Sequence, residues 1–329
     1  MSAEAKANAA PALVGQQSDS LREAFGKAIS QLAETDTAIV VLDADVAGGT
    51  GAHHFRKRHP DRFVQCGIAE QNMVGVAAGM AHRGLKPFVT TFAVFMMRGL
   101  EQIRLSVAYS GANVKLIASH PGLDVGPDGA SAQCLEDLAC MRAIPNMVVL
   151  SPCDAHEVAA ATRALANYEG PAYMRTGRSP CPNVFDAEPE FTIGKGRVLR
   201  EGRDLTLVGC GVMTQRALVA AEQLAKEGVS ARVVHMPSIK PIDRELLIES
   251  ARSTQLVVTC EDHNIIGGLG SAVAEVLSEV ALVPVRRIGV EDVIGGSGEP
   301  DELAQHYGLD AVSIISKTLA FYRELNSHD

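Results

Sequence analysis

The sequence has little of what several protein classes need. It contains no tryptophan and only 4% aromatic residues, and its 30 basic residues are outnumbered by 39 acidic ones, for a net charge of −9. A chain without a basic surplus cannot neutralise a nucleic-acid backbone or an anionic membrane surface. The composition therefore argues against nucleic-acid and membrane partners.

The seven cysteines are scattered, odd in number and never spaced as C-x-x-C. They indicate neither a disulfide framework nor a zinc site, and they fit a reducing cytoplasm, where we expect the protein. No apolar run reaches the ~20 residues of a membrane-spanning helix. The alanine-rich start lacks the basic and apolar parts of a secretory signal, so we expect residues 1–16 to be a disordered tail.

Short apolar runs rich in β-branched residues alternate with segments of helix length. A chain of 329 residues with 47% hydrophobic content suits two domains. The first runs show little alternation of apolar and polar residues, as is typical of strands buried on both faces of a parallel sheet. We expect strands at 38–44, 62–67, 86–92, 114–120, 146–152 and 171–175, with helices at 20–34, 68–83, 97–109, 133–143 and 154–168.

The alternation of apolar runs and helix-length segments stops at residues 176–193, which hold three prolines and show no periodicity. It then resumes with expected strands at 204–211, 230–236, 255–262 and 284–290 and helices at 213–227, 243–253, 267–279 and 311–325. The pattern predicts an α/β protein with two doubly wound domains. We expect the first domain at 17–180, a linker at 181–193 and a smaller second domain at 194–329.

Two segments place polar or aromatic groups where expected strands end. In G-I-A-E-Q-N-M, residues 67–73, Glu70 opens a helix directly after a strand, where open α/β sheets bind ligands. An acidic residue that favours the helix dipole would give the same pattern. In the second segment Phe92 and Phe95 follow another strand; two such rings can stack on a flat heterocycle or simply belong to the core.

A third segment is the glycine-rich loop S-H-P-G-L-D-V-G-P-D-G-A-S-A-Q at 119–133, which carries His120, Asp124 and Asp128. Polar residues in a loop above a rigid sheet are typical of binding sites. Together the three segments resemble the pyrimidine-binding domain of the transketolase family of thiamine-diphosphate enzymes. E-D-H-N-I-I-G-G-L-G-S at 261–271 and V-H-M-P-S-I-K-P-I-D at 234–243 resemble the family's C-terminal domain.

The resemblance implies a binding site for thiamine diphosphate. Glu70 would be the catalytic carboxylate that shares a proton with N1′ of the aminopyrimidine. Phe92 and Phe95 would pack against that ring, and Asp45 and Arg98 would also contact the cofactor. Arg98 replaces a tyrosine of classical transketolases, and F-M-M-R-G-L-E-Q is more similar to deoxyxylulose-phosphate synthase.

The resemblance also implies a substrate site for a sugar phosphate. Arg22, His120 and Arg175 occupy the family's phosphate-binding positions, and Asp128 corresponds to the aspartate that reads the hydroxyl at C2 of the donor. Two positions depart from the family: Ala132 replaces a second loop histidine and Gly49 replaces a phosphate-contacting serine. The donor ketose and the aldehyde acceptor stay open, from pentose phosphates to apulose phosphate or sulfo-sugars.

The family's G-D-G motif, which anchors the diphosphate and its Mg²⁺ or Ca²⁺ ion, does not occur in this sequence. The resemblance therefore implies one subunit of a split transketolase, with no metal ligands of its own. A partner chain would supply them in an assembly of two copies of each chain. The alternatives are the β subunit of a 2-oxo-acid dehydrogenase, a synthase-like enzyme, and a dinucleotide-binding module, although D-A-D-V-A-G-G-T at 43–50 lacks G-x-G-x-x-G.

Overall fold

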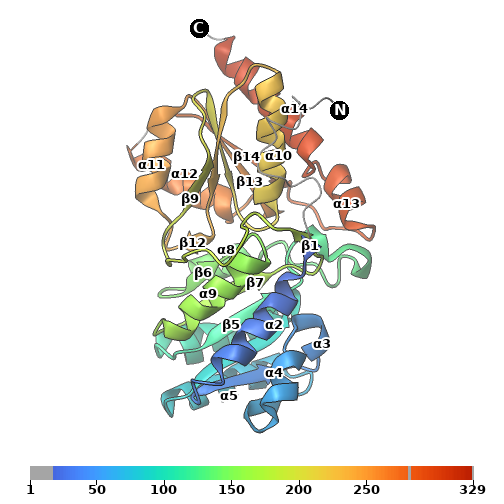
Figure 1. The fold of residues 1–329 in the computed structure, drawn as a ribbon, viewed down its shortest axis with the longest axis vertical. Coiled ribbons are helices and arrows are strands. Elements are labelled where there is room, and N and C mark those ends of the chain that lie inside the picture. The colour runs from blue at the N-terminus through green and yellow to red at the C-terminus, as the bar shows by residue number, and fades with distance from the viewer. Residues whose placement is uncertain (1–17, 281–282, 328–329) are drawn as a thin grey trace.

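A computed structural model describes residues 18–280 and 283–327. The chain forms two α/β domains that follow each other along the long axis of the molecule (Figure 1). The expected tail at 1–16 lies outside the described residues. Within the described ranges, no helix combines the length and the apolar character needed to cross a bilayer.

The first domain is built on a seven-stranded sheet in the order β12-β6-β7-β5-β4-β2-β3. Six of these strands run parallel and were expected from the apolar runs. They are β2 (Ile39–Asp43), β3 (Phe63–Gln65), β4 (Lys86–Phe92), β5 (Lys115–Ser119), β6 (Val148–Leu150) and β7 (Ala172–Thr176).

Helices cover both faces of this sheet because successive strand residues point to opposite sides. Leu42 packs in one apolar cluster with the helices on one face, whereas Val41 packs in another with the helices on the opposite face. The first face holds α5 (Glu70–His82) and α8 (Asp137–Ala143). It also holds the consecutive helical turns α6 (Ala93–Met96), η2 (Met97–Gly99), α7 (Leu100–Gln102) and η3 (Ile103–Tyr109). The second holds α2 (Leu21–Leu32), α4 (His53–Arg58) and α9 (Ala155–Asn167).

The second domain is a five-stranded sheet in the order β14-β13-β10-β11-β9. Four strands are parallel, and β9 (Arg197–Arg200) pairs antiparallel with β11 at the edge. The parallel strands are β10 (Leu205–Gly209), β11 (Ala231–His235), β13 (Val257–Asn264) and β14 (Val285–Val290). The helices are α10 (Met213–Lys226), α11 (Arg244–Ser253), α12 (Leu269–Val280), α13 (Pro300–His306) and α14 (Ala311–Asn326). The expectation of two α/β domains is confirmed.

Several short elements were not expected from the sequence. Strand β12 (Ser238–Lys240) lies in the second half of the chain but pairs antiparallel with β6, so it completes the sheet of the first domain. Strand β8 (Cys181–Pro182), at the start of the expected linker, pairs with β1 (Ser18–Asp19). The remaining short helices are α3 (Ala47–Thr50), η1 (Pro60–Arg62) and η4 (Leu123–Asp128).

Candidate functional site

The carboxyl ends of β4 and β5 bring the aromatic segment and the glycine-rich loop together. Phe92 and Ser119 are register partners, so Phe92 and His120 leave the sheet side by side. The Phe92 and His120 rings stack with their centroids 3.6 Å apart. The Phe95 ring also stacks with Phe92, at a centroid distance of 5.2 Å. The sheet thus presents three stacked flat rings at the edge where parallel sheets bind ligands.

Gly49, at the end of α3, leaves room for this stack. A Cβ atom at position 49 would lie 2.6 Å from the Phe92 ring and 3.6 Å from the His120 ring. The Phe92 ring therefore fills space that a serine would need. The Phe92 ring can occupy this position because residue 49 has no side chain.

Glu70 begins α5, as expected, and its side chain is only 4% exposed. Nε of Arg98 lies 3.8 Å from one carboxylate oxygen, and the Arg98 side chain is 72% exposed. Gly99 packs against the first turn of α5, close to the backbone of Glu70. A buried carboxylate next to one exposed arginine can hold or exchange a proton with a ligand that approaches from the Arg98 side.

His120 is buried, and its backbone adopts a positive φ of 59°. Burial, followed by the charges of Arg22 and Arg178, lowers the pKa of His120 to about 4, against the opposing effect of Asp128. The ring is therefore neutral near pH 7. Because Ser119 Oγ lies 2.9 Å from Nδ1, His120 can offer Nε2 to a ligand as a hydrogen-bonding group rather than as a cation.

Asp128 lies at the mouth of the site, next to the His120 ring. Its carboxylate accepts hydrogen bonds from Arg178, from Nε at 3.1 Å and from Nη2 at 3.3 Å. Nε2 of His120 is 3.9 Å from the same carboxylate. Arg22 donates from Nη1 to the carbonyl of Gly49 at 3.1 Å. The structure therefore brings Arg22, His120 and Asp128 together with Arg178, which sequence reasoning missed.

Arg175 does not join this group. It is buried, its Nε donates to Asp137 at 2.8 Å and its Nη2 donates to the other oxygen of the same carboxylate. Its Nη1 donates to the carbonyl of Asp262 in the second domain at 3.0 Å. A guanidinium held this way links the two domains through buried contacts, whereas Arg178 is the arginine that contacts Asp128. Arg175 and Arg178 are three positions apart in one stretch, so the sequence pattern alone does not distinguish which of them contacts Asp128.

Asp262, on β13 of the second domain, anchors the loop of the first domain. Its carboxylate accepts from the backbone N–H groups of Leu123, at 2.8 Å, and Asp124, at 3.2 Å. Gly122 permits this approach, because a Cβ there would lie 2.1 Å from the Asp262 carboxylate and its φ is +72°. The E-D-H segment of the second domain thus positions the loop that carries Asp128.

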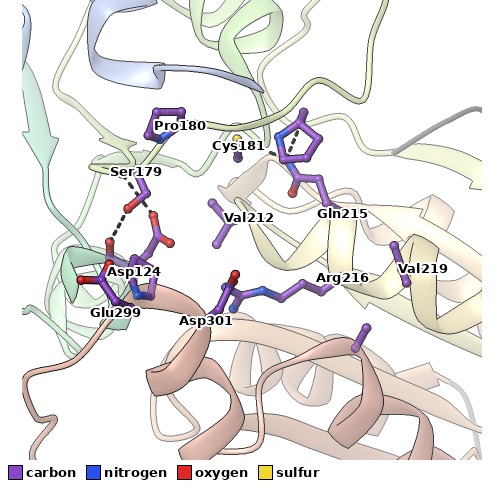
Figure 2. Close-up of a pocket in the computed structure, with 13 residues that line it drawn as sticks. Asp124, Ser179, Pro180, Cys181, Val212, Gln215, Arg216, Val219, Glu299 and Asp301 are labelled. Atoms are coloured by element: carbon purple, nitrogen blue, oxygen red, sulfur yellow. Dashed lines mark hydrogen bonds between the residues drawn. The ribbon is translucent and has the colours of Figure 1, made fainter. Parts of the chain in front are cut away.

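Behind this loop lies a cavity of about 440 Å³ between the two domains (Figure 2). Asp124 faces it and accepts a hydrogen bond from the N–H of Ser179 at 3.4 Å, and Arg216 and Asp301 reach in from the second domain. Burial, and then the neighbouring Asp262 carboxylate, raise the pKa of Asp124 to about 7. The cavity is lined by Asp124 of the loop but by none of the three stacked rings.

The remaining predicted residue, Asp45, follows β2 at the same edge of the sheet. It is exposed and has a positive φ of 66°, and its N–H donates to Gln65 at 3.1 Å. The buried Glu70 carboxylate and the stack of Phe92 with Phe95 fit the aminopyrimidine half of thiamine diphosphate, because that ring is flat and carries a basic nitrogen.

Fold and site together define an enzyme of the thiamine-diphosphate class, represented by its pyrimidine-binding and C-terminal domains. Residues 17–183 match the family model described as "Transketolase, pyrimidine binding domain" and residues 194–314 match "Transketolase, C-terminal domain". The chain belongs to the transketolase family, which confirms the resemblance read from the sequence. It is a transketolase-type transferase, and its family uses thiamine diphosphate.

Three similar proteins carry related names. The "Putative transketolase C-terminal section" of Methanocaldococcus jannaschii is 46% identical, over 91% of this chain and 95% of that protein. The "6-deoxy-6-sulfo-D-fructose transketolase subunit SqwH" of Clostridium sp. (strain MSTE9) is 41% identical, over 90% of this chain and 92% of that protein. The solved structure of a "Split gene transketolase, inactive beta4 tetramer" superposes with a TM-score of 0.84 at 50% identity, over 91% of this chain and 97% of that one.

Proposed function

We propose that this chain is the pyrimidine-binding subunit of a split transketolase, which transfers a two-carbon ketol unit from a phosphorylated ketose to an aldehyde. The observation that carries the proposal is the buried Glu70 at the sheet edge that also presents the stack of Phe92, Phe95 and His120. A sequence without G-D-G leaves the diphosphate and its Mg²⁺ or Ca²⁺ ion to a partner chain.

Thiamine diphosphate supplies, when bound, a nucleophilic carbon that attacks the ketose carbonyl. Glu70 holds at its carboxylate oxygen the proton that is shared with the aminopyrimidine N1′, and burial keeps water from competing for that proton. Phe92 and Phe95 orient the flat ring, and Arg98 places a positive charge between the Glu70 carboxylate and solvent. Asp45 is assigned to the same cofactor site from its place at the end of β2.

The donor binds at the group formed by Arg22, His120, Asp128 and Arg178. Arg178 offers a planar pair of donors that suits a phosphate dianion, and Arg22 adds a second positive charge. Because Asp128 accepts from Nε and Nη2 on one edge of the Arg178 guanidinium, a phosphate that binds to the same edge competes with Asp128. That exchange frees the Asp128 carboxylate to accept a hydrogen bond from the donor hydroxyl next to the carbonyl.

Several observations support a partner chain. Relatives that match this chain over nearly their whole length are named as a C-terminal section and as a transketolase subunit, and one solved relative is described as an inactive tetramer of a split-gene transketolase. We propose an assembly of two copies of each chain, with the cofactor between them. All seven cysteines are unpaired, which suits the cytoplasmic location that we propose.

Reconstitution tests this function. The purified chain is assayed for ketol transfer with thiamine diphosphate and Mg²⁺, alone and with a transketolase chain that carries the G-D-G motif. We expect the chain alone to be inactive and to bind the cofactor weakly, and activity to appear on mixing. Full ketol transfer by this chain alone would contradict the division of the site between two chains.

A further inference from the structure

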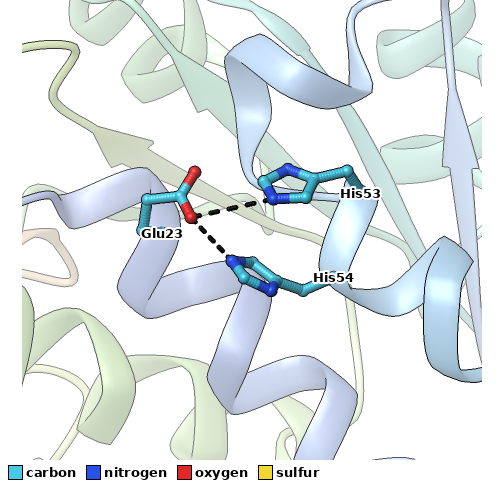
Figure 3. Close-up of side chains that lie close together, drawn as sticks. All are labelled: Glu23, His53 and His54. Atoms are coloured by element: carbon cyan, nitrogen blue, oxygen red, sulfur yellow. Dashed lines mark hydrogen bonds and ion pairs between the residues drawn. The ribbon is translucent and has the colours of Figure 1, made fainter.

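A cluster of two histidines and one glutamate lies where α2 and α4 meet, outside the site described above (Figure 3). Nε2 of His54 lies 2.6 Å from Oε2 of Glu23, and Nε2 of His53 lies 3.8 Å from the same oxygen. The two imidazole rings are adjacent, with centroids 4.2 Å apart. The three side chains are each about one third exposed, at 32%, 37% and 30% for Glu23, His53 and His54.

The backbone holds these side chains in place. A Cβ on Gly26 of α2 would lie 2.0 Å from the carbonyl oxygen of Gly51, so the two segments touch through their backbones. Gly51 itself has a φ of +79° and closes on the Arg22 carbonyl in the same way. Ser30 Oγ adds a hydrogen bond to the carbonyl of His54 at 3.4 Å. Helix α2 and the segment from Gly51 into α4 are therefore fixed relative to each other.

His53 provides a separate observation. Within the described residues its Nδ1 is buried and has no hydrogen-bond partner. Its Nε2 is 3.8 Å from Glu23, too far for a hydrogen bond. Nε2 of His53 thus faces the Glu23 carboxylate without a hydrogen bond, and Nε2 of His54 approaches the same oxygen, so three metal-ligating atoms from three side chains converge on one place (Figure 3).

We propose that Glu23, His53 and His54 bind a Zn²⁺ ion. Imidazole nitrogen and carboxylate oxygen are ligands that Zn²⁺ prefers, and three protein ligands leave the fourth tetrahedral position to water. With bonds of ~2.0–2.1 Å, tetrahedral ligand atoms lie about 3.4 Å apart. The His54–Glu23 contact would open slightly and the His53–Glu23 contact would close slightly, both by rotations of partly exposed side chains.

This site differs in chemistry from the metal site of the transketolase reaction. Mg²⁺ and Ca²⁺ take oxygen ligands, and we assign that ion to the partner chain, whereas two imidazoles select a softer cation. Glu23 directly follows Arg22, whose guanidinium donates to Gly49 beside the ring stack. A bound Zn²⁺ ion would therefore fasten the turn that carries Arg22 to α4.

The test uses the full chain without a histidine tag. Zn²⁺ affinity is measured by competition with a chromophoric chelator, in buffer that contains Mg²⁺, for the wild type and for Glu23→Gln, His53→Asn and His54→Asn. The control is His82→Asn, which changes an exposed histidine at the end of α5. We expect one Zn²⁺ per chain in the wild type and the control, with Mg²⁺ unable to displace it.

Each ligand variant is expected to bind Zn²⁺ more weakly by at least the ~10–100-fold that loss of an outer-shell partner costs. Zn²⁺ is expected to raise the Tm of the wild type and of His82→Asn but not that of Glu23→Gln. X-ray absorption at the zinc edge should show nitrogen and oxygen ligands only. Unchanged affinity in the three ligand variants, or sulfur in the zinc spectrum, would overturn the proposal, as would a wild type that binds no Zn²⁺.

Discussion

Arg175 and Asp137 form a buried ion pair in which two nitrogens of the guanidinium donate to the two oxygens of one carboxylate. The hydroxyl of Tyr173 donates to the same carboxylate at 2.5 Å. Although burial acts to raise it, the pKa of Asp137 is held below its ordinary value by Arg175. Removing one partner of such a pair leaves the other charged and buried.

We therefore predict that Arg175→Ala lowers the free energy of unfolding by about 3–5 kcal/mol, the usual cost of breaking a buried ion pair. Urea unfolding followed by circular dichroism measures the change. Arg178→Ala is the control, because the pair of Arg178 with Asp128 is about one third exposed and contributes little to stability. Equal stability of both variants would show that the Arg175 pair is not a structural contact.

The converse effect is expected for substrate binding in the reconstituted enzyme. Arg178→Ala should raise KM for a phosphorylated ketose by about 10- to 100-fold, since a hydrogen bond to a charged group contributes about 1.5–3 kcal/mol, with a smaller change in kcat. An unphosphorylated ketose serves as the control donor and should respond little. If KM for both donors changed equally, the phosphate contact assigned to Arg178 would be wrong.

Glu70→Gln should remove most activity and leave the fold intact. The amide keeps the size of the side chain but cannot exchange a proton, and loss of a positioned proton-transfer group typically costs about 10²- to 10⁴-fold in rate. Steady-state kcat of the reconstituted enzyme measures the loss, with thermal unfolding as the check on the fold. Near-native turnover would reduce Glu70 to a residue that favours the start of α5.

Restoring a serine at position 49 should impair the enzyme. Because its Cβ would lie 2.6 Å from Phe92, the ring must move, and such overpacking typically costs about 1–3 kcal/mol of stability. We expect kcat/KM to fall as well, because the displaced ring no longer orients the cofactor. Gly48→Ser is a matched control, since a Cβ at position 48 meets no atom within 4 Å. A Gly49→Ser enzyme with improved kcat/KM would mean that the serine regains a phosphate contact without disturbing the rings.

Asp124 should make stability depend on pH. Its folded-state pKa of about 7 exceeds the ordinary aspartate pKa of 3.8, so between these values the folded state binds more protons and its stability falls as pH rises. Asp124→Asn removes this penalty. The variant's gain over the wild type should be near zero at pH 4, grow toward pH 7 and level off above it, at on the order of 4 kcal/mol. Urea unfolding from pH 4 to pH 8 measures the gain; a gain that is constant with pH would exclude Asp124 as the source.

Local patterns predicted much of the fold. The parallel strands of both domains were visible because they are buried on both faces, and Glu70 was visible because a strand ends just before it. β12 was missed because a strand of three residues carries no periodicity, and its partner β6 lies far away along the chain. Pattern reasoning could not foresee which sheet that strand would join.

The site was harder to predict from the sequence for a physical reason. Arg175 and Arg178 occupy one polar stretch, and only tertiary contacts decide that the first is buried against Asp137 and the second faces Asp128. Burial also makes His120 a neutral group, which its residue type alone does not indicate. Glu23 and the two neighbouring histidines are about 30 positions apart, so their proximity appears only when α2 packs on α4.

The crossing of β12 onto β6 has a consequence for dissection of the protein. A fragment that ended in the linker, at residue 193, would contain every strand of the first sheet except β12. The outer N–H and C=O groups of β6 would then face solvent as an open edge, the kind of surface on which sheets of separate molecules join. The first domain thus depends on a strand from the second half of the chain to cover this edge and to avoid association with other molecules.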